Sequence, residues 1–294
     1  INMDASEPDK LRRLETQILH RHAGGWHSYS YTWNVDQTDA ELAGRAGFDL
    51  TLHIREEDGS IRKLTRHYAG RTECLLCHTT RGGSVYGFKV DQLNRDFDYG
   101  KATDNQLRTL AHIGIFEEPL AKGASPTEAP IADLPASTNP YDFNAKLTDR
   151  ARAYLHVNCA HCHRRGGGGT AAIEVPLNVN LPKTNLVSRP TQGTFGLADS
   201  WVVSPGDPYS STLYYRMAKV GRGRMPHFGS QVVDEGGIRL IHDWIEQLAA
   251  EPSGPNIRKA TPEEKAAADK LKTANESSLL LLTGGFGVKP QLQD

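Results

Sequence analysis

The sequence predicts an α+β fold in which a small antiparallel β-sheet region precedes a helical region. Apolar and polar residues alternate in several stretches between residues 15 and 67, a pattern typical of half-buried strands. From residue 147 onward, apolar residues instead recur at the 3.6-residue period of a helix. A proline-rich segment, residues 117–140, separates the two patterns and reads as an extended linker.

The β region begins with a predicted hairpin. Residues 15–22 and 26–33 flank Ala23-Gly24-Gly25, a sequence suited to a tight turn. A second alternating stretch follows, and after the turn residues 57–59 a further strand is expected around residues 61–67. The second stretch alternates at Phe48, Leu50, Leu52 and Ile54. We therefore expect one small antiparallel sheet of about four strands.

Several helices are expected after this region. The first covers about residues 90–97, and the next covers residues 103–113, where Thr103 and Gln106 match a capping box. A helix from residue 147 runs into residues 159–162, and a short one covers residues 210–218. Asp234 is the expected N-cap of an amphipathic helix, and Thr261 that of a last helix to about residue 273. The apolar stripe of the amphipathic helix consists of Ile238, Ile241, Trp244, Ile245 and Leu248.

These patterns suggest three regions. Residues 1–140 form a β-rich N-terminal region that ends in the proline-rich linker, residues 141–250 form a helical domain, and residues 251–294 form a helical tail.

All four cysteines belong to two copies of Cys-x-x-Cys-His. This pattern is the signature of covalent c-type haem attachment, in which two thiols bond to the porphyrin and the histidine binds iron. The sequence thus predicts two covalently bound haem c groups, with His78 and His163 as proximal iron ligands. The first copy consists of Cys74, Cys77 and His78, and the second of Cys159, Cys162 and His163.

Two other interpretations of the cysteines remain open at this point. The two Cys-x-x-Cys pairs match a zinc site with four thiolates, and either pair alone matches a thioredoxin-like dithiol. Neither chemistry requires a histidine directly after both pairs, so haem attachment is favoured. Residues 166–169, four consecutive glycines, indicate close backbone approach rather than a phosphate site.

Composition excludes some classes of function. The chain has 38% hydrophobic and 23% charged residues and a formal net charge of −1, which argues against nucleic-acid binding. Its longest aliphatic run, residues 279–282, is too short to span a membrane. No signal-peptide pattern opens the sequence, as expected for a processed protein or an excised segment.

The region from about residue 145 to 250 resembles class I cytochrome c. The resemblance rests on the order of a helix leading into Cys159, the loop Arg224-Met225-Pro226, and the closing helix after Asp234. It implies an all-α class I cytochrome c domain in which Met225 is the distal ligand of the second haem. The alternative is that Met225 only fills space in the core.

A broader resemblance covers most of residues 15–250. Several phrases resemble a dihaem cytochrome region of bacterial proteins, which is sometimes joined to a sugar-dehydrogenase-like propeller that uses pyrroloquinoline quinone. The phrases are Tyr31-Thr-Trp-Asn, Gln37-Thr-Asp-Ala, Glu73-Cys-Leu-Leu-Cys-His, Gln92-Leu-Asn-Arg, Asn105-Gln-Leu and Arg150-Ala-Arg-Ala-Tyr-Leu-His-Val-Asn-Cys. This resemblance implies a periplasmic or otherwise exported protein, and it favours Met217 as sixth ligand of the first haem over His67, His112 or His156.

The expected function is electron transfer rather than enzymatic catalysis. A methionine opposite His163 would leave that iron no open position, which favours relay of electrons from a periplasmic dehydrogenase to a cytochrome or oxidase. The alternatives are a dihaem peroxidase-like enzyme with one open haem, and a haem-bearing sensory or structural module.

Overall fold

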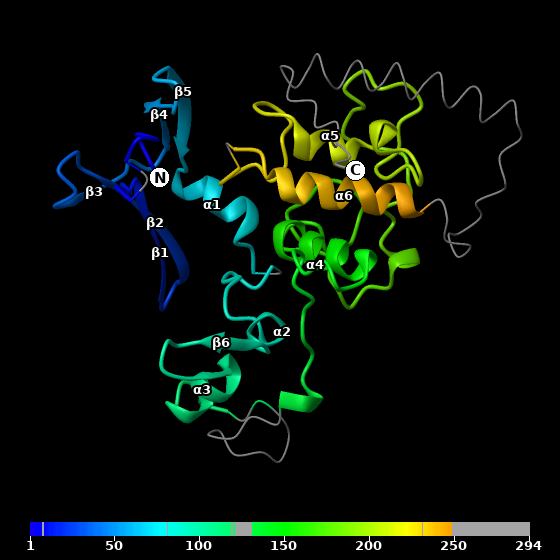
Figure 1. Ribbon diagram of the computed structural model, residues 1–294, viewed down its shortest axis with the longest axis horizontal. Coiled ribbons are helices and arrows are strands. Elements are labelled where there is room, and N and C mark those ends of the chain that lie inside the picture. Colours follow the sequence, from blue (N-terminus) through cyan, green and yellow to red (C-terminus); the bar gives the residue numbers. More distant parts are fainter. Residues whose placement is uncertain (8, 81, 119, 121–130, 231, 249–294) are drawn as a thin grey trace, which may run out of the picture. The chain divides into compact units, whose positions relative to one another are not determined.

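The computed structural model describes residues 1–248 except 8, 81, 119, 121–130 and 231. These residues form two compact units (Figure 1). The larger unit contains Ile1–Val85 and the described residues from Tyr154 onward, and the smaller unit contains Tyr86–Ala153. Both Cys-x-x-Cys-His motifs lie in the larger unit.

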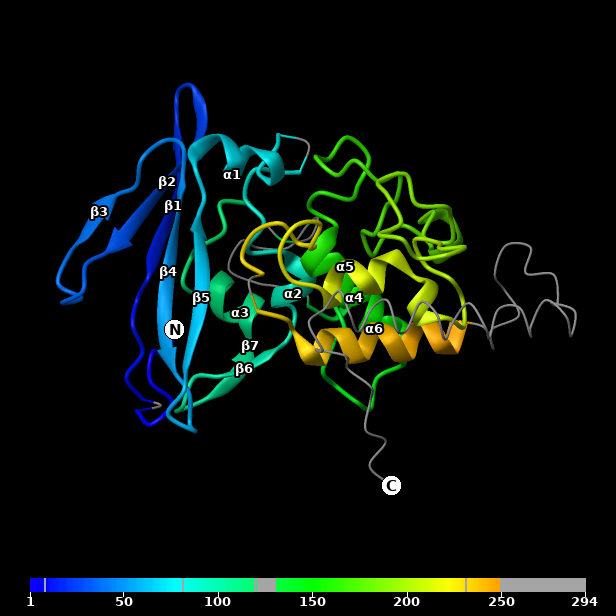
Figure 2. The ribbon, with the colours of Figure 1, turned by 90° about the horizontal axis from the view of Figure 1, so that it is seen from above.

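The N-terminal strands form two sheets, so the expected single sheet of about four strands is wrong. Strands β1 (Glu15–His22), β2 (Gly25–Trp33) and β3 (Ala40–Leu42) form an antiparallel sheet, and β4 (Phe48–Arg55) and β5 (Ile61–Tyr68) form a separate two-stranded sheet (Figure 2). The alternating pattern identified β1, β2, β4 and β5 but not the short β3. It does not specify partners, because each hairpin can satisfy its backbone hydrogen bonds locally.

The first hairpin and the inward face of β4 follow the sequence pattern. His22 pairs with Gly25, so Ala23 and Gly24 form a two-residue turn. In β4, Leu52 and Ile54 are buried, whereas the more N-terminal Phe48 and Leu50 remain about 40% exposed. At the other end of the hairpin the buried residue is Tyr68, which pairs with Phe48.

Helix α1 (Arg71–Cys77) follows β5 and packs against β2. The Arg71 guanidinium lies 4.8 Å from the ring centroid of Tyr29, a cation–π contact between the helix and the sheet. A carboxylate oxygen of Glu73 accepts a hydrogen bond from the backbone N–H of Gly70 at 2.7 Å, which satisfies one donor at the helix N-terminus. These contacts fix the short helix that carries Cys74 and Cys77.

The smaller unit contains α2 (Val90–Leu93), β6 (Asp96–Asp98), β7 (Thr103–Asn105), α3 (Gln106–His112) and the short 3₁₀ helix η1 (Ile131–Asp133). The expected helices over residues 90–97 and 103–113 were too long, because β6 pairs with β7. Helix α3 is capped by Asn105, whose side chain accepts a hydrogen bond from Leu107 N at 3.0 Å, rather than by Thr103. Leu107 and Ala111 are fully buried.

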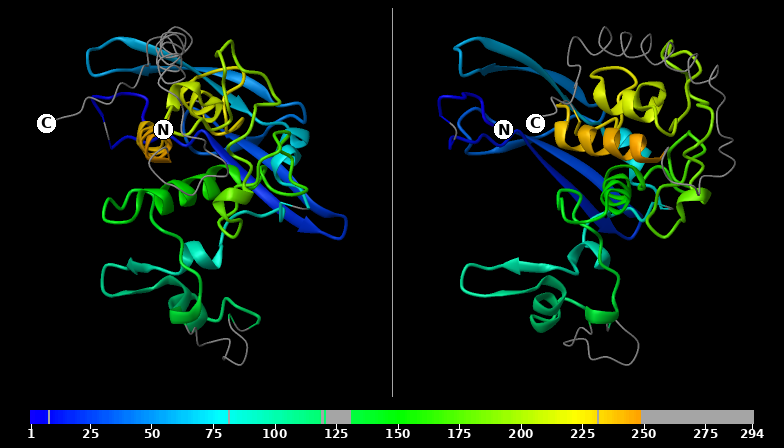
Figure 3. Two further views of the ribbon diagram at one scale, coloured as in Figure 1. Left: turned by 90° about the vertical axis from the view of Figure 1, so that its right-hand side faces the viewer. Right: turned by 45° about the vertical axis from the view of Figure 1, so that its right-hand side comes forward.

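Helix α4 (Leu147–Cys159) confirms the 3.6-residue pattern leading into the second motif, with Ala151 and Leu155 fully buried. Helix α6 (Glu235–Leu248) confirms the expected amphipathic helix and its cap, since Asp234 Oδ1 accepts from Gly237 N at 3.0 Å. Helix α5 (Thr212–Ala218) packs against α6 (Figure 3), and Trp244 is completely buried.

The expectation of an all-α class I cytochrome c domain over residues 141–250 is wrong. Helices make up 26% of the structure and strands 20%, and the helices are too few and too short for such a domain. Between α4 and α5 the chain forms only two 3₁₀ turns, η2 (Leu181–Lys183) and η3 (Pro208–Ser210). Buried residues without helical period, such as Ile173, Val175 and Leu186, hold this stretch against the core as irregular backbone.

Among the described helices, none is long and apolar enough to cross a membrane. The expected helix over residues 261–273 and much of the proline-rich linker lie outside the described residues.

Candidate functional site

The first motif lies on α1 and at its C-terminus. Cys74 and Cys77 are in the helix, and His78 is the C-cap residue. His78 Nδ1 lies 2.5 Å from the backbone oxygen of Ser84. Because a carbonyl oxygen can only accept, Nδ1 carries a hydrogen, and in a neutral ring the lone pair would be on Nε2. Metal-ligating histidines are usually oriented by this kind of hydrogen bond.

The second motif begins where α4 ends. The backbone N–H groups of Cys162 and His163 donate to Cys159 O at 3.1 and 2.8 Å, so the chain turns tightly after the helix. Among the described residues, His163 Nδ1 is buried without a hydrogen-bond partner. Burial lowers the pKa of His163, which favours the neutral imidazole, the form that ligates metals.

The glycine loop, residues 166–169, lies against both motifs. A Cβ on Gly168 would lie 2.1 Å from the Leu76 carbonyl oxygen in α1, and one on Gly169 would lie 2.7 Å from His163 Nδ1. Neither distance leaves room for a side chain. The sequence-based interpretation of close backbone approach is therefore confirmed, although the partner here is the other motif.

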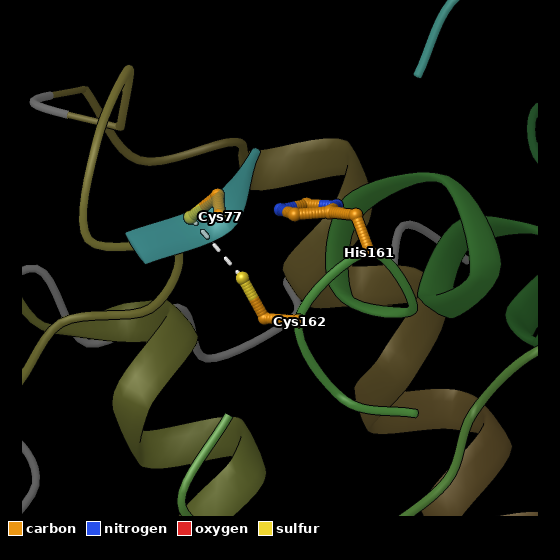
Figure 4. Close-up of side chains that lie close together, drawn as sticks. All are labelled: Cys77, His161 and Cys162. Atoms are coloured by element: carbon orange, nitrogen blue, oxygen red, sulfur yellow. Dashed lines mark hydrogen bonds between the residues drawn. The ribbon is translucent and has the colours of Figure 1, made fainter. Parts of the chain in front are cut away.

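The second cysteines of the two motifs, Cys77 and Cys162, are in contact. Cys77 Sγ and Cys162 Sγ lie 3.1 Å apart although the residues are 85 positions apart in the chain. His161 lies beside them, and the ligand atoms of the three side chains are all within 4.8 Å of one another (Figure 4). The hydrogen bonds from Cys162 and His161 lower the pKa of Cys77, so its sulfur holds negative charge more readily than an ordinary thiol.

A cavity of about 390 Å³ adjoins the second motif. Its lining includes Cys159 and His161 from the motif, Met217 from α5 and Met225 from the loop before α6. No residue of the first motif lines it. The volume falls within the range of small-molecule and cofactor pockets.

Arg224 is buried in the same cavity wall. Its guanidinium donates to the backbone oxygens of Met217 at 2.7 Å and Val232 at 2.9 Å, and also to that of Lys219. Nε has no partner among the described residues. Burial lowers the pKa of Arg224, while nearby Tyr154 and Asp234 oppose that shift. Arg224 thus ties the two methionine-bearing segments together and places positive charge at the cavity.

The four residues considered as sixth ligand of the expected first haem lie in different surroundings. Met217 is buried and lines the cavity next to Cys159 together with Met225, and His78 is not part of that lining. His67 bonds to Asp49 at 2.6 Å through Nδ1 and to Glu73 at about 3 Å through Nε2. His156 Nδ1 accepts from Leu177 N at 3.4 Å, and His112 belongs to the smaller unit.

Sequence reasoning missed two site residues, His161 and Arg224, and the partner of a third. His161 was treated only as a variable position inside the second motif, and Arg224 only as a neighbour of Met225. Gly168 was noted for close approach, but its partner Leu76 lies 92 positions earlier in the printed sequence. The one available signal was the position of Arg224 next to the candidate ligand Met225. A buried arginine is rare unless it has hydrogen-bond partners.

The arrangement of the thiols argues against the zinc-site and the dithiol interpretations of the cysteines. Within the described residues, Cys77 and Cys162 group with His161, whereas Cys74 and Cys159 are not part of that cluster, so four thiolates do not converge on one zinc site. Burial raises the pKa of Cys74 and raises that of Cys159 to about 12. A dithiol redox centre instead needs a low pKa at the first cysteine of the pair.

In comparisons with protein-family models, curated proteins and solved structures, nothing matches this chain.

Proposed function

We propose that the chain is a dihaem c-type cytochrome that transfers electrons. The observation that supports this most directly is that every cysteine belongs to a Cys-x-x-Cys-His motif and that both motif histidines suit iron ligation. His78 is oriented through Nδ1, and His163 is buried in an environment that favours the neutral ring.

The cavity beside the second motif supplies part of a haem site. Cys159 lines it together with two thioether side chains and a buried cationic side chain, whereas Cys162 and His163 are not part of its lining. In the proposed holoprotein Cys159 and Cys162 would bond to the group, and His163 and Met225 would be its iron ligands. The charge of Arg224 suits a propionate. At the first motif, Cys74, Cys77 and His78 would hold the second group.

A bound haem c supplies one-electron chemistry at its iron. The chain's own part is to bind, orient and insulate. His163 would supply a neutral nitrogen ligand, and a thioether ligand such as Met225 would favour the ferrous state. A haem held by both residues would exclude exogenous ligands, and the expected activity is outer-sphere electron transfer.

We propose a dehydrogenase as the electron donor and a cytochrome or oxidase as the acceptor, in the periplasm or another exported location. This setting follows from the resemblance to dihaem cytochrome regions and from the chemistry of haem attachment. None of the four cysteines forms a disulfide among the described residues, so all four thiols are available for cofactor attachment.

The first test is to produce the full chain in a bacterial host with a c-type haem maturation system and to count haem by alkaline pyridine spectra and intact mass. We expect two haems per chain. The Cys159→Ala/Cys162→Ala variant should retain one. A haem-free chain that binds zinc through its cysteines would refute the proposal.

The second test adds cyanide and peroxide to the ferric protein. We expect the absorption spectrum and the EPR signals of two low-spin haems to remain unchanged. A haem that binds cyanide or reacts with peroxide would contradict electron transfer as the sole function and would favour the peroxidase-like alternative.

A further inference from the structure

We propose that the tip of the β1–β2 hairpin binds a divalent transition-metal cation such as Zn²⁺ through His20, His22 and His27. This site is separate from the proposed function, because none of its ligands belongs to a Cys-x-x-Cys-His motif or lines the cavity beside the second motif. Its ligands come from the two strands of one hairpin, so the local pairing of β1 with β2 is sufficient to form it.

The register of the two strands places the three side chains on one face. His20 and His22 are two positions apart on β1, and side chains at that spacing point to the same side of a strand. His27 on β2 is paired directly with His20, and His22 is paired with Gly25, which has no side chain. On this face, the two residue pairs nearest the turn therefore contribute three imidazoles and no other side chain.

The three rings already lie close together. The ring centroids of His22 and His27 are 3.9 Å apart with their planes tilted by 27°, and the centroid of His20 is 5.7 Å from that of His22. A Cβ on Gly24, in the turn, would lie 3.3 Å from His22 Cε1 and 3.9 Å from His27 Nε2. A glycine at this position thus leaves the space beside the turn to the stacked rings.

The ring nitrogens are accessible to a cation. All three histidines are exposed, and β3 pairs only with Tyr31–Trp33, at the opposite end of β2 (Figure 1). Within the part of the chain that the structure describes, the rings of His20 and His27 make no hydrogen bond or ion pair. His22 Nδ1 accepts one long hydrogen bond, from Gly24 N at 3.3 Å, and water can replace it at this exposed position.

Metal binding requires a movement of side chains. The ligand nitrogens of the three rings are not all within 4.8 Å of one another, so an ion must draw them together. Directly paired residues such as His20 and His27 have Cβ atoms about 4.5–5.5 Å apart, within the span of two imidazoles that meet at one ion. Because the rings are exposed and held by no more than one weak hydrogen bond, rotation about side-chain bonds can bring them to the ion while the backbone stays in place.

The donor set determines the class of cation. Three imidazoles without a carboxylate suit Zn²⁺ and its first-row neighbours, whereas Ca²⁺ and Mg²⁺ prefer oxygen ligands. Three protein ligands leave the fourth position of a tetrahedral ion open to water or to an external ligand. Because the ion would join both strands next to the turn, its binding should also stabilise the folded hairpin.

The first test is an isothermal calorimetric titration of the full haem-loaded chain with Zn²⁺ alone. We expect one ion per chain, and His20→Ala, His22→Ala and His27→Ala should each weaken this binding at least severalfold, because each removes one of three ligands. The matched control is His53→Ala, which replaces an exposed histidine on β4, in the other sheet, and should bind like the parent. Binding that the three substitutions leave unchanged, or no binding at all, would overturn the site.

A second measurement identifies the ligands in the unsubstituted chain. Exposed histidines react with diethyl pyrocarbonate, and peptide mass spectrometry reports the extent of reaction at each one. We expect Zn²⁺ to protect the three hairpin histidines but not His53. Protection of none of the three, or of His161 in their place, would refute the site. A chain that carries no haem would refute the proposed function and leave this test intact, since protection is read at each histidine separately.

Discussion

Met225 and Met217 share one cavity wall, yet their surroundings differ. Met217 lies within α5, where neighbouring side chains are buried on almost every side, and it is 6% exposed. Met225 lies in a loop, and its backbone N–H donates to Arg216 O at 3.0 Å. The preceding residue, Arg224, fixes this loop to α5 through its hydrogen bond to Met217 O. Helix packing accounts for Met217 without any ligand role, whereas a braced loop that presents a thioether to a cavity suits ligation.

Met225→His should lower the reduction potential of one haem. An imidazole stabilises the ferric state better than a thioether does, so a fall on the order of 0.1 V is expected, within the roughly 0.8 V range that axial ligands span. The near-infrared band of methionine-ligated ferric haem should disappear from a redox titration followed by absorption.

Met217→Leu is the control for that substitution. It keeps an apolar side chain of similar volume in α5, so the band and both potentials should remain. Loss of the band in Met217→Leu and its persistence in Met225→His would exchange the roles of the two methionines.

His67 links β4, β5 and α1 through a pH-dependent contact. Burial lowers its pKa, but the hydrogen bonds to Asp49 and Glu73 outweigh this and raise it above 6.5. A raised pKa in the folded state means that the stabilisation is complete below about pH 6.5 and is lost as the pH rises through the folded-state pKa.

His67→Gln should therefore remove up to about 1 kcal/mol of stability at mildly acidic pH, the scale of a part-exposed ion pair, and much less above the folded-state pKa. Urea unfolding of the two proteins across that pH range measures the difference. A difference that does not change with pH would show that the charged form of His67 contributes nothing.

At the scale of elements, α4 and α6 meet at one close contact. Tyr154 on α4 donates through its hydroxyl to Asp234 Oδ2 at 2.9 Å, and Asp234 caps α6. Gly237, in the first turn of α6, leaves space for the Tyr154 ring, because a Cβ there would lie 2.3 Å from the phenolic oxygen. The helix that carries the second motif and the helix that closes the cavity are thus locked together.

Gly237→Ala should destabilise the protein by about 1–3 kcal/mol, the usual cost of adding a methyl group to a tightly packed contact. In an open helix the same change would stabilise, since alanine is the better helix former. Chemical denaturation measures the sign directly, with Gly44→Ala as a control. A stabilised Gly237→Ala protein would show that Tyr154 moves aside without cost.

The elements that were predicted correctly have strong local signals. The first hairpin, β4, α4 and α6 each show a regular apolar pattern and a recognisable turn or cap. The wrong predictions concern which nearby residue caps a helix and which strands pair. Asn105 rather than Thr103 caps α3, because Thr103 to Asn105 are held in β7 by pairing with β6. No pattern within residues 103–113 reports that pairing.

The expectation of an all-α domain failed for a related reason. The prediction rested on three features in the expected order: the helix leading into Cys159, the loop with Met225 and the closing helix. It assumed that the chain between them is helical as well, yet residues 160–211 contain few helix-forming runs. Their proline and glycine residues interrupt helices, and their apolar residues are buried without a period. The order of motifs therefore did not determine the architecture around them.

For the whole molecule, the sequence identified the cysteines and histidines of the two motifs but neither the other residues of the candidate site nor its assembly. All four cysteines and both motif histidines follow from two short patterns. The contact between Cys77 and Cys162, the position of His161 and the buried charge of Arg224 all depend on residues that are distant in sequence. Such contacts depend on how distant parts of the chain pack together, and a single sequence contains no direct signal of that packing.

The larger unit is discontinuous, since Tyr86–Ala153 is inserted between its two parts. During synthesis the first motif is therefore complete long before the glycine loop and the second motif exist. The first part of the larger unit can pack against the second part only after the whole smaller unit has been synthesised. The larger unit therefore combines local hairpins with one very long loop closure. Its final assembly is therefore expected to be a late event in folding.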